Sequence, residues 1–277
     1  MYRALLLLLL LMTLAGCGGG NAEPGQEATN QPAAKDNTPG ANIARSNELL
    51  AEGKARYDKS EFEKAITELT EAVEWNPDNA RAWDLLGRCH YKLKHWRDCR
   101  DAFKNALRNA DASVRQAQAG YVMESSTELG KQAMAIGQYK LAEEHARDAL
   151  QWNRAYLPAV KLLAEALYQR GQFDDARTQF QALAEQNVGE DRHNGLYWAG
   201  LCSTQLRQYD KAEATFSTLI KEGYTAGDVY YWRAECRADR KDMEGAIQDV
   251  NLAIANAASP DRRKELEAVR AELEKRK

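Results

Sequence analysis

The sequence predicts an all-helical solenoid of about six repeated helical hairpins, and two observations lead to this fold class. The first is a small residue that recurs in steps of 34, 43, 34, 36 and 34 residues, at Ala65, Cys99, Ala142, Ala176, Ala212 and Ala246. The second is that each of these marker residues follows a large apolar residue by three positions and a glycine or alanine by twelve. A fixed period in this range is typical of stacked repeats, and small residues on apolar stripes at helical spacing indicate helices in contact.

The composition is that of a folded chain with balanced charge. Of its 277 residues, 44% are hydrophobic and 29% are charged, and the formal net charge is −3. This is enough chain to bury a sizeable core. Because neither sign of charge is in excess, the composition predicts no nucleic-acid partner.

The N-terminus has the pattern of a signal peptide, which we expect to span residues 1–16. Arg3 supplies a positive charge, residues 4–14 form an apolar run, and a small-residue processing site follows at residues 14–17. The apolar run is about half of the ~20 residues that a membrane-spanning helix needs.

The motif Leu-Ala-Gly-Cys at residues 14–17 resembles the lipobox of bacterial lipoproteins. The resemblance implies that Cys17 is lipidated, becomes the first mature residue and anchors the protein to the cell membrane or outer membrane, on the extracytoplasmic side. In bacteria with two membranes, Gly18 favours the outer one. An ordinary secretory signal with a chance cysteine is the alternative. Residues 17–43 are rich in small and polar residues, so we expect a flexible linker with a reach of roughly 25–30 Å.

The repeats themselves resemble the tetratricopeptide repeat, whose pattern places Trp, Leu-Gly, Tyr, Ala, Phe, Ala and Pro at fixed offsets. The second copy matches best, with Trp83, Leu86, Gly87, Tyr91, Phe103 and Ala106. We expect repeats at 46–79, 80–113, 123–156, 157–190, 193–226 and 227–258, within a solenoid spanning 44–258. The physical reason for the pattern is that small residues let two helices approach closely while large residues fill the seam around them.

Capping and turn residues also predict where several helices begin and end. Ser60 and Glu63 read as a capping box for the second helix of the first repeat. Gly137 and Gly171, each five residues before its marker, suit a tight turn with positive φ. The long step before the third repeat indicates either one long helix over 112–135 or a short helix that leads into the third pair. Pro260 begins a final helix, and residues 259–277 read as a capping helix.

A cluster of two cysteines and two histidines in the second repeat has the spacing Cys-His-x4-His-x3-Cys, which raises the question of a metal site. Helical geometry predicts that Cys89 faces the preceding repeat, away from Cys99, and that His95 lies in the turn. We therefore expect no metal site, no cofactor and four buried thiols without disulfides. We also expect no enzyme activity, because no acid, base or nucleophile residues converge.

The first helices carry the candidate binding residues. In the tetratricopeptide family these helices line a concave groove that holds proteins or peptides. The corresponding positions here, carried over by register, are Lys54, Tyr57, Arg81, Asp84, Arg88, Tyr91, Lys92, Lys131, Lys161, Glu165, Tyr168, Tyr197, Asp228, Tyr231, Glu235 and Asp239. The first half of the set is basic and the far end acidic, so acidic segments are candidate partners. A polar, solvated face without a partner is the alternative.

The sequence as a whole predicts a lipid-anchored scaffold or assembly factor of the bacterial cell envelope that binds protein or peptide partners. Two other functions stay open at this point. One is a lipoprotein that binds a soluble peptide or glycan, which would need a closed pocket. The other is a pilotin-like factor for type IV pilus or secretin assembly, which rests on the arrangement of lipobox and repeats alone.

Overall fold

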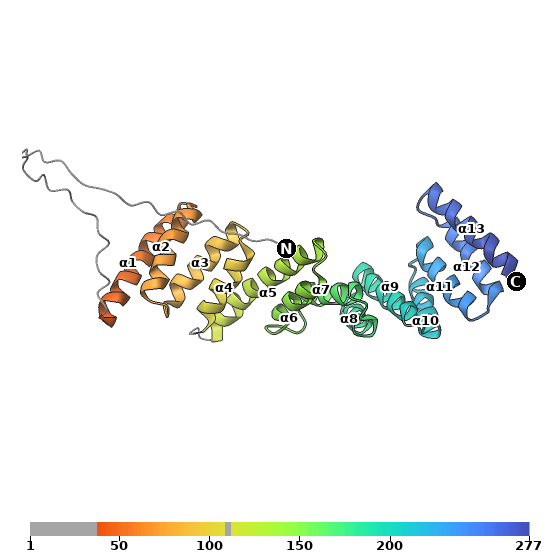
Figure 1. Cartoon of the computed structure of the whole chain (residues 1–277), viewed down its shortest axis with the longest axis horizontal. Coiled ribbons are helices and arrows are strands. Elements are labelled where there is room, and N and C mark those ends of the chain that lie inside the picture. Colours follow the sequence, from red (N-terminus) through yellow and green to blue (C-terminus); the bar gives the residue numbers. More distant parts are fainter. Residues whose placement is uncertain (1–37, 109–111, 277) are drawn as a thin grey trace, which may run out of the picture. The chain divides into compact units, whose positions relative to one another are not determined.

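The computed structural model describes residues 38–108 and 112–276, and every regular element in these ranges is an α-helix (Figure 1). The helices are α1 (Pro39–Asp58), α2 (Phe62–Trp75), α3 (Ala80–Lys92), α4 (Trp96–Leu107), α5 (Ala112–Ala135), α6 (Tyr139–Leu150), α7 (Leu157–Gln169), α8 (Phe173–Gln186), α9 (Gly189–Gln205), α10 (Tyr209–Lys221), α11 (Gly227–Asp239), α12 (Met243–Ala255) and α13 (Pro260–Arg276). The predicted signal peptide, Cys17 and the linker up to residue 37 lie outside the described residues. The predicted all-helical fold class is confirmed.

Each helix packs against the next one along the chain, so α1 to α12 form six hairpins and α13 packs against α12. Residues 112–135 form one continuous helix, α5, so the first of the two predictions for the 43-residue step before the third repeat is confirmed. α1 begins at Pro39, so residues 39–43 are helical although the sequence placed them in the linker. Proline fits the first turn of a helix because its fixed φ is already helical and its missing N–H has no partner there.

Small residues allow the close approach within the hairpins, as the sequence predicts. All six marker residues are completely buried. A Cβ atom added to Gly87 would lie 2.8 Å from the ring of Phe103, and one added to Gly200 would lie 2.6 Å from the ring of Phe216. Both distances are below van der Waals contact, so each phenylalanine occupies the space that the missing side chain leaves.

The turns inside the six hairpins share one backbone conformation. The residue five positions before each marker has a positive φ, between 56° and 74°, in glycine and non-glycine residues alike. These residues are Ser60, Lys94, Gly137, Gly171, Arg207 and Lys241. The prediction for Gly137 and Gly171 is therefore confirmed. At the other four positions the turn imposes a left-handed conformation that costs an L-residue about 1–2 kcal/mol.

The predicted capping box at Ser60 is wrong. Ser60 occupies the left-handed turn position, with φ 60°, and the residue that caps α2 is Glu61, which makes no side-chain capping hydrogen bond. A serine that caps a helix needs an extended backbone so that its hydroxyl can reach the first free N–H groups. The hairpin turn takes precedence over the local capping signal at this position.

The four described cysteines are free and buried, as predicted. Cys89 packs with Leu49 and Ala65 of the preceding hairpin, which is the direction that helical geometry indicates. Burial raises the pKa of Cys89 and Cys202 to about 12, so both thiols stay protonated and inert at neutral pH. These side chains fill the core between hairpins.

The final helix closes the array. Leu266 and Leu273 of α13 are buried against the last hairpin, while most of the other side chains are charged and exposed. This agrees with a helix that covers the end of the core with a polar outer face. No helix in the described ranges is long and apolar enough to cross a membrane.

Candidate functional site

The basic residues predicted on the first helices fall into two groups. Lys54 and Arg88 are paired with carboxylates on their own helices, Lys54 Nζ with Asp58 Oδ2 at 2.6 Å and Arg88 Nε with Asp84 Oδ2 at 2.8 Å. Within the described residues, the exposed Arg81 and Lys92 have no such ion pair. The positive charge that a partner meets in the N-terminal half is therefore smaller than the sequence suggests.

The predicted tyrosines are built into the walls between helices. Tyr57 contacts Phe62 edge-on at 5.4 Å between ring centroids, and the hydroxyl of Tyr91 donates a hydrogen bond to Glu124 at 2.8 Å. This hydrogen bond, together with burial, raises the pKa of Tyr91 to about 12. Tyr197 accepts a hydrogen bond from the indole of Trp232 at 3.1 Å. These rings fix neighbouring hairpins to one another and offer only part of their surface to a partner.

The acidic far end is in contact with the capping helix. The guanidinium of Arg262 on α13 lies 4.9 Å from the centre of the Tyr231 ring and pairs with Asp228 at 2.9 Å. Arg262 therefore neutralises part of the acidic group that the sequence assigns to the groove. Glu235 is half-buried, and this burial raises the pKa of its carboxyl group.

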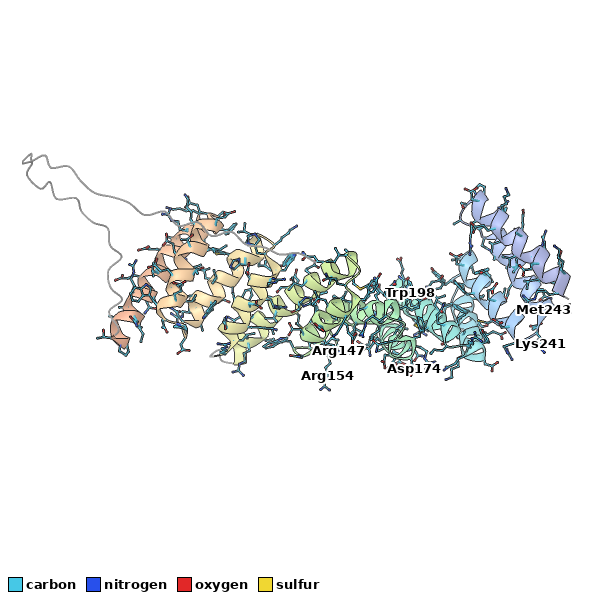
Figure 2. The ribbon with its side chains drawn as sticks, viewed as in Figure 1. Arg147, Arg154, Asp174, Trp198, Lys241 and Met243 are labelled. Carbon is cyan, nitrogen blue, oxygen red and sulfur yellow. The ribbon has the colours of Figure 1, made fainter. Side chains whose placement is uncertain are left out.

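The structure gathers one part of the predicted set around a cavity of about 570 Å³. Lys131 on α5 and Lys161 and Glu165 on α7 line it, and all three belong to the predicted groove. The remaining walls come from residues that sequence reasoning missed. These are Leu157, Pro158, Leu162, Phe180, Leu183, Asn187, Asp191, Asn194, Gly195 and Trp198, the last of which is labelled in Figure 2.

The cavity lies between two neighbouring first helices, α7 and α9. Among the described helices, the backbones of α1 and α3, α3 and α5, α5 and α7, and α9 and α11 approach closely, whereas those of α7 and α9 do not reach the same level of contact. At the same time α9 is drawn tightly against α8. A Cβ added to Gly195 would lie only 2.8 Å from the backbone of Phe180 and Ala184. Gly195 also lines the cavity, so the α8–α9 contact forms part of its wall.

The cavity combines an apolar floor with charged groups. Phe180 and Leu183 supply apolar surface, and the ring of Trp198 stacks on Phe180 at 5.7 Å and meets Tyr168 edge-on at 5.1 Å. Burial raises the pKa of Glu165, although Lys161 and Lys131 act in the opposite direction. The arrangement suits an apolar or aromatic side chain flanked by polar or charged groups.

Three tetratricopeptide sequence models match the chain. Two are described as tetratricopeptide repeat and match residues 133–199 and 204–262, and one is described as TPR repeat and matches residues 53–94. The matched stretches include five of the six marker residues, all but Cys99, and they fall on the hairpins described above.

Among curated proteins, Tetratricopeptide repeat protein 16 of Homo sapiens is 24% identical over 216 residues, which are 73% of this chain and 24% of that protein. This chain thus spans about a quarter of that relative's length. A tetratricopeptide repeat protein of Parabacteroides merdae has a solved structure that matches with 15% identity and a TM-score of 0.41, covering 80% of this chain and 82% of that one. Pseudomonas aeruginosa pilF matches with 14% identity and a TM-score of 0.43, covering 82% and 98%. Similarity at this level says nothing about partners. From the sequence models and the six hairpins together, the chain carries tetratricopeptide repeats.

Proposed function

We propose that this chain is a lipid-anchored scaffold of the bacterial cell envelope, which binds a segment of a partner protein along its first helices and performs no chemistry of its own. The observation that carries the proposal is the cavity between α7 and α9, because it joins three predicted groove residues to an apolar floor. A recessed apolar site with a few charged groups is where a partner side chain can be desolvated and held.

The charges around the cavity indicate what the partner segment carries. Lys161 is exposed, and within the part of the chain that the structure describes Lys131 pairs only with the partly exposed Glu128 on its own helix, at 2.6 Å. Both are available to a carboxylate, because exposed pairs on one helix contribute little and exchange readily. The partner segment therefore places an apolar or aromatic side chain in the cavity and an acidic residue beside it.

Reversal of the two lysine charges is expected to abolish partner binding. The test compares the full lipoprotein with a Lys131→Glu/Lys161→Glu variant in capture from envelope extract. A matched control carries the same charge change at Lys211 and Lys221 on the second helix α10. We expect proteins retained by the parent and the control to fall by about tenfold or more with the cavity variant, which corresponds to about 1.4 kcal/mol. Equal retention by both variants would place the binding surface elsewhere.

The lipid anchor is the second part of the proposal, and it rests on Leu-Ala-Gly-Cys after the apolar run at the N-terminus. Several acyl chains on one residue hold a protein on a membrane stably, whereas one chain holds it marginally. In bacterial cells, we expect the parent to partition into detergent and to carry acyl mass on the N-terminal peptide. The Cys17→Ser variant is expected to lose both properties. A parent that starts at another residue without acyl mass would contradict the anchor.

A small soluble ligand is the second candidate function, and the size of the cavity favours it. Its volume of about 570 Å³ falls within the range of pockets that hold small molecules, roughly 300–1,000 Å³. A short peptide or glycan fragment would then be the cargo. The capture experiment separates the two functions, because a small-ligand protein would retain no protein that depends on Lys131 and Lys161.

A further inference from the structure

We infer that His90, His95 and Asp98 form a binding site for a divalent transition-metal ion of the Zn²⁺ class, at the turn between α3 and α4. Each of the three residues offers one ligand atom, and these atoms all lie within 4.8 Å of one another. Two imidazole nitrogens and one carboxylate oxygen are a ligand set that Zn²⁺ accepts. The site is separate from the cavity between α7 and α9.

The backbone of the α3–α4 hairpin brings the three residues close together. His90 is in the last turn of α3, His95 precedes α4, and Asp98 is in the first turn of α4. Between them Lys94 has a φ of 59°, and the backbone N–H of His95 donates to the carbonyl of His90 at 2.9 Å. The turn is thus the same left-handed turn that the other five hairpins use, and it brings both helix ends to one place.

The polar groups of this cluster have few partners within the protein. The Nδ1 atom of His90 is buried and has no hydrogen-bond partner, which is an unusual state for a buried polar atom. The side chain of His95 makes no capping hydrogen bond to α4, and among the described residues Asp98 forms no ion pair. The rings of His90 and His95 lie close together, tilted by 46° with centroids 5.8 Å apart. Lone pairs on all three side chains are therefore available to an ion.

The ligand atoms can approach an ion through movement of the exposed side chains. His95 and Asp98 are exposed and free to rotate. In a tetrahedral site with bonds of ~2.0–2.1 Å, the ligand atoms lie ~3.3 Å apart. Rotation of these side chains can bring the ligand atoms from within 4.8 Å of one another to that distance.

The sequence predicts no metal site in this region because Cys89 faces the preceding repeat, and the proposed site differs in that it uses no thiol. Cys89 packs into the preceding hairpin and Cys99 packs on Phe103, so neither thiol takes part. The third ligand is Asp98, one position before Cys99. Three protein ligands leave a coordination position for water or for a group from a partner protein.

Titration of the full chain with Zn²⁺ tests the site. We expect one ion to bind per chain, and His95→Gln or Asp98→Asn to weaken binding by about tenfold or more, since each removes one ligand. Both residues are exposed at the turn, so the variants keep the fold, and circular dichroism checks this. His193→Gln is the matched control, because it removes a histidine elsewhere and is expected to leave the affinity unchanged. Equal affinity in all variants, or no binding by the parent, would overturn the site.

Cobalt substitution distinguishes these ligands from the thiols. Co²⁺ bound by two histidines and an aspartate is expected to absorb in the visible range without a thiolate charge-transfer band in the near ultraviolet. The visible band should be lost in the Asp98→Asn variant and kept in the His193→Gln variant. A thiolate band in the parent would assign the ion to cysteine and contradict the proposal.

Discussion

Replacement of Phe216 by alanine is expected to lower the free energy of unfolding by about 3–5 kcal/mol, because it deletes a buried ring from the interior of the fifth hairpin. Phe216 is 0% exposed and packs with Leu201, Leu219 and Val229, which come from three helices. Urea denaturation followed by circular dichroism gives the value. The matched control is Leu252→Ala, because Leu252 is 43% exposed and its loss is expected to change stability little.

A second change at Gly200 tests the physical reason for this effect. In the parent, a Cβ at Gly200 would lie 2.6 Å from the Phe216 ring, so Gly200→Ala is expected to destabilise by about 1–3 kcal/mol through overpacking. In the Phe216→Ala background the same methyl group enters vacated space, and its cost should vanish or reverse. Additive effects would mean that the ring and the glycine do not share this space.

The periodicity of the chain was sufficient to predict the helices, because burial at a helix–helix contact needs a small residue at a fixed position. Ala65, Ala142 and Ala212 mark three of these contacts, and each is completely buried. One long helix was also one of the two predictions for residues 112–135, since the insertion before Ala142 carries no Gly-Pro cluster that would end a helix. These features depend on the local sequence and on contacts between neighbouring repeats, which together determine most of the stability of a solenoid.

The features that sequence could not supply depend on longer-range packing. The cavity at Lys161 and Glu165 is lined by side chains from α5, α7, α8 and α9, and no local pattern encodes how these helices are placed around it. Arg262 pairs with Asp228, which lies 34 residues earlier in the sequence, and no local pattern around Arg262 predicts this ion pair. The left-handed turn at Ser60 was not predicted, because a positive φ is expected chiefly at glycine. Serine instead favours the N-cap of a helix.

Replacement of Asp249 by alanine is expected to destabilise the C-terminal hairpins by about 3–5 kcal/mol, because it removes the buried anion that two partly buried guanidinium groups share. Asp249 on α12 is 1% exposed. It accepts from Arg233 Nε at 2.8 Å and from Arg237 Nη1 at 2.9 Å, both on α11. The hydrogen bond to Asp249 raises the pKa of Arg233. An arginine keeps its positive charge even without such a partner, so the substitution leaves that charge in place.

The same network extends to the preceding hairpin, which decides where the destabilisation should appear. Arg237 Nε donates to Glu213 at 3.0 Å and Arg233 Nη1 to Ser217 at 3.2 Å, both on α10. Hydrogen exchange is therefore expected to rise in α10, α11 and α12 together, while amides of α1 to α4 keep their protection, because stability in a repeat array is local.

Asp210→Ala is the matched control for this prediction, since Asp210 also pairs with an arginine, Arg240, but its side chain is 83% exposed. Water solvates both charges when that pair is broken, so the expected change is within about 0.5 kcal/mol. Equal effects of the two aspartate substitutions would mean that burial of Asp249 is not what gives the network its strength. A large loss at Asp249 alone would identify the buried carboxylate as the link that makes the fifth and sixth hairpins unfold as one unit.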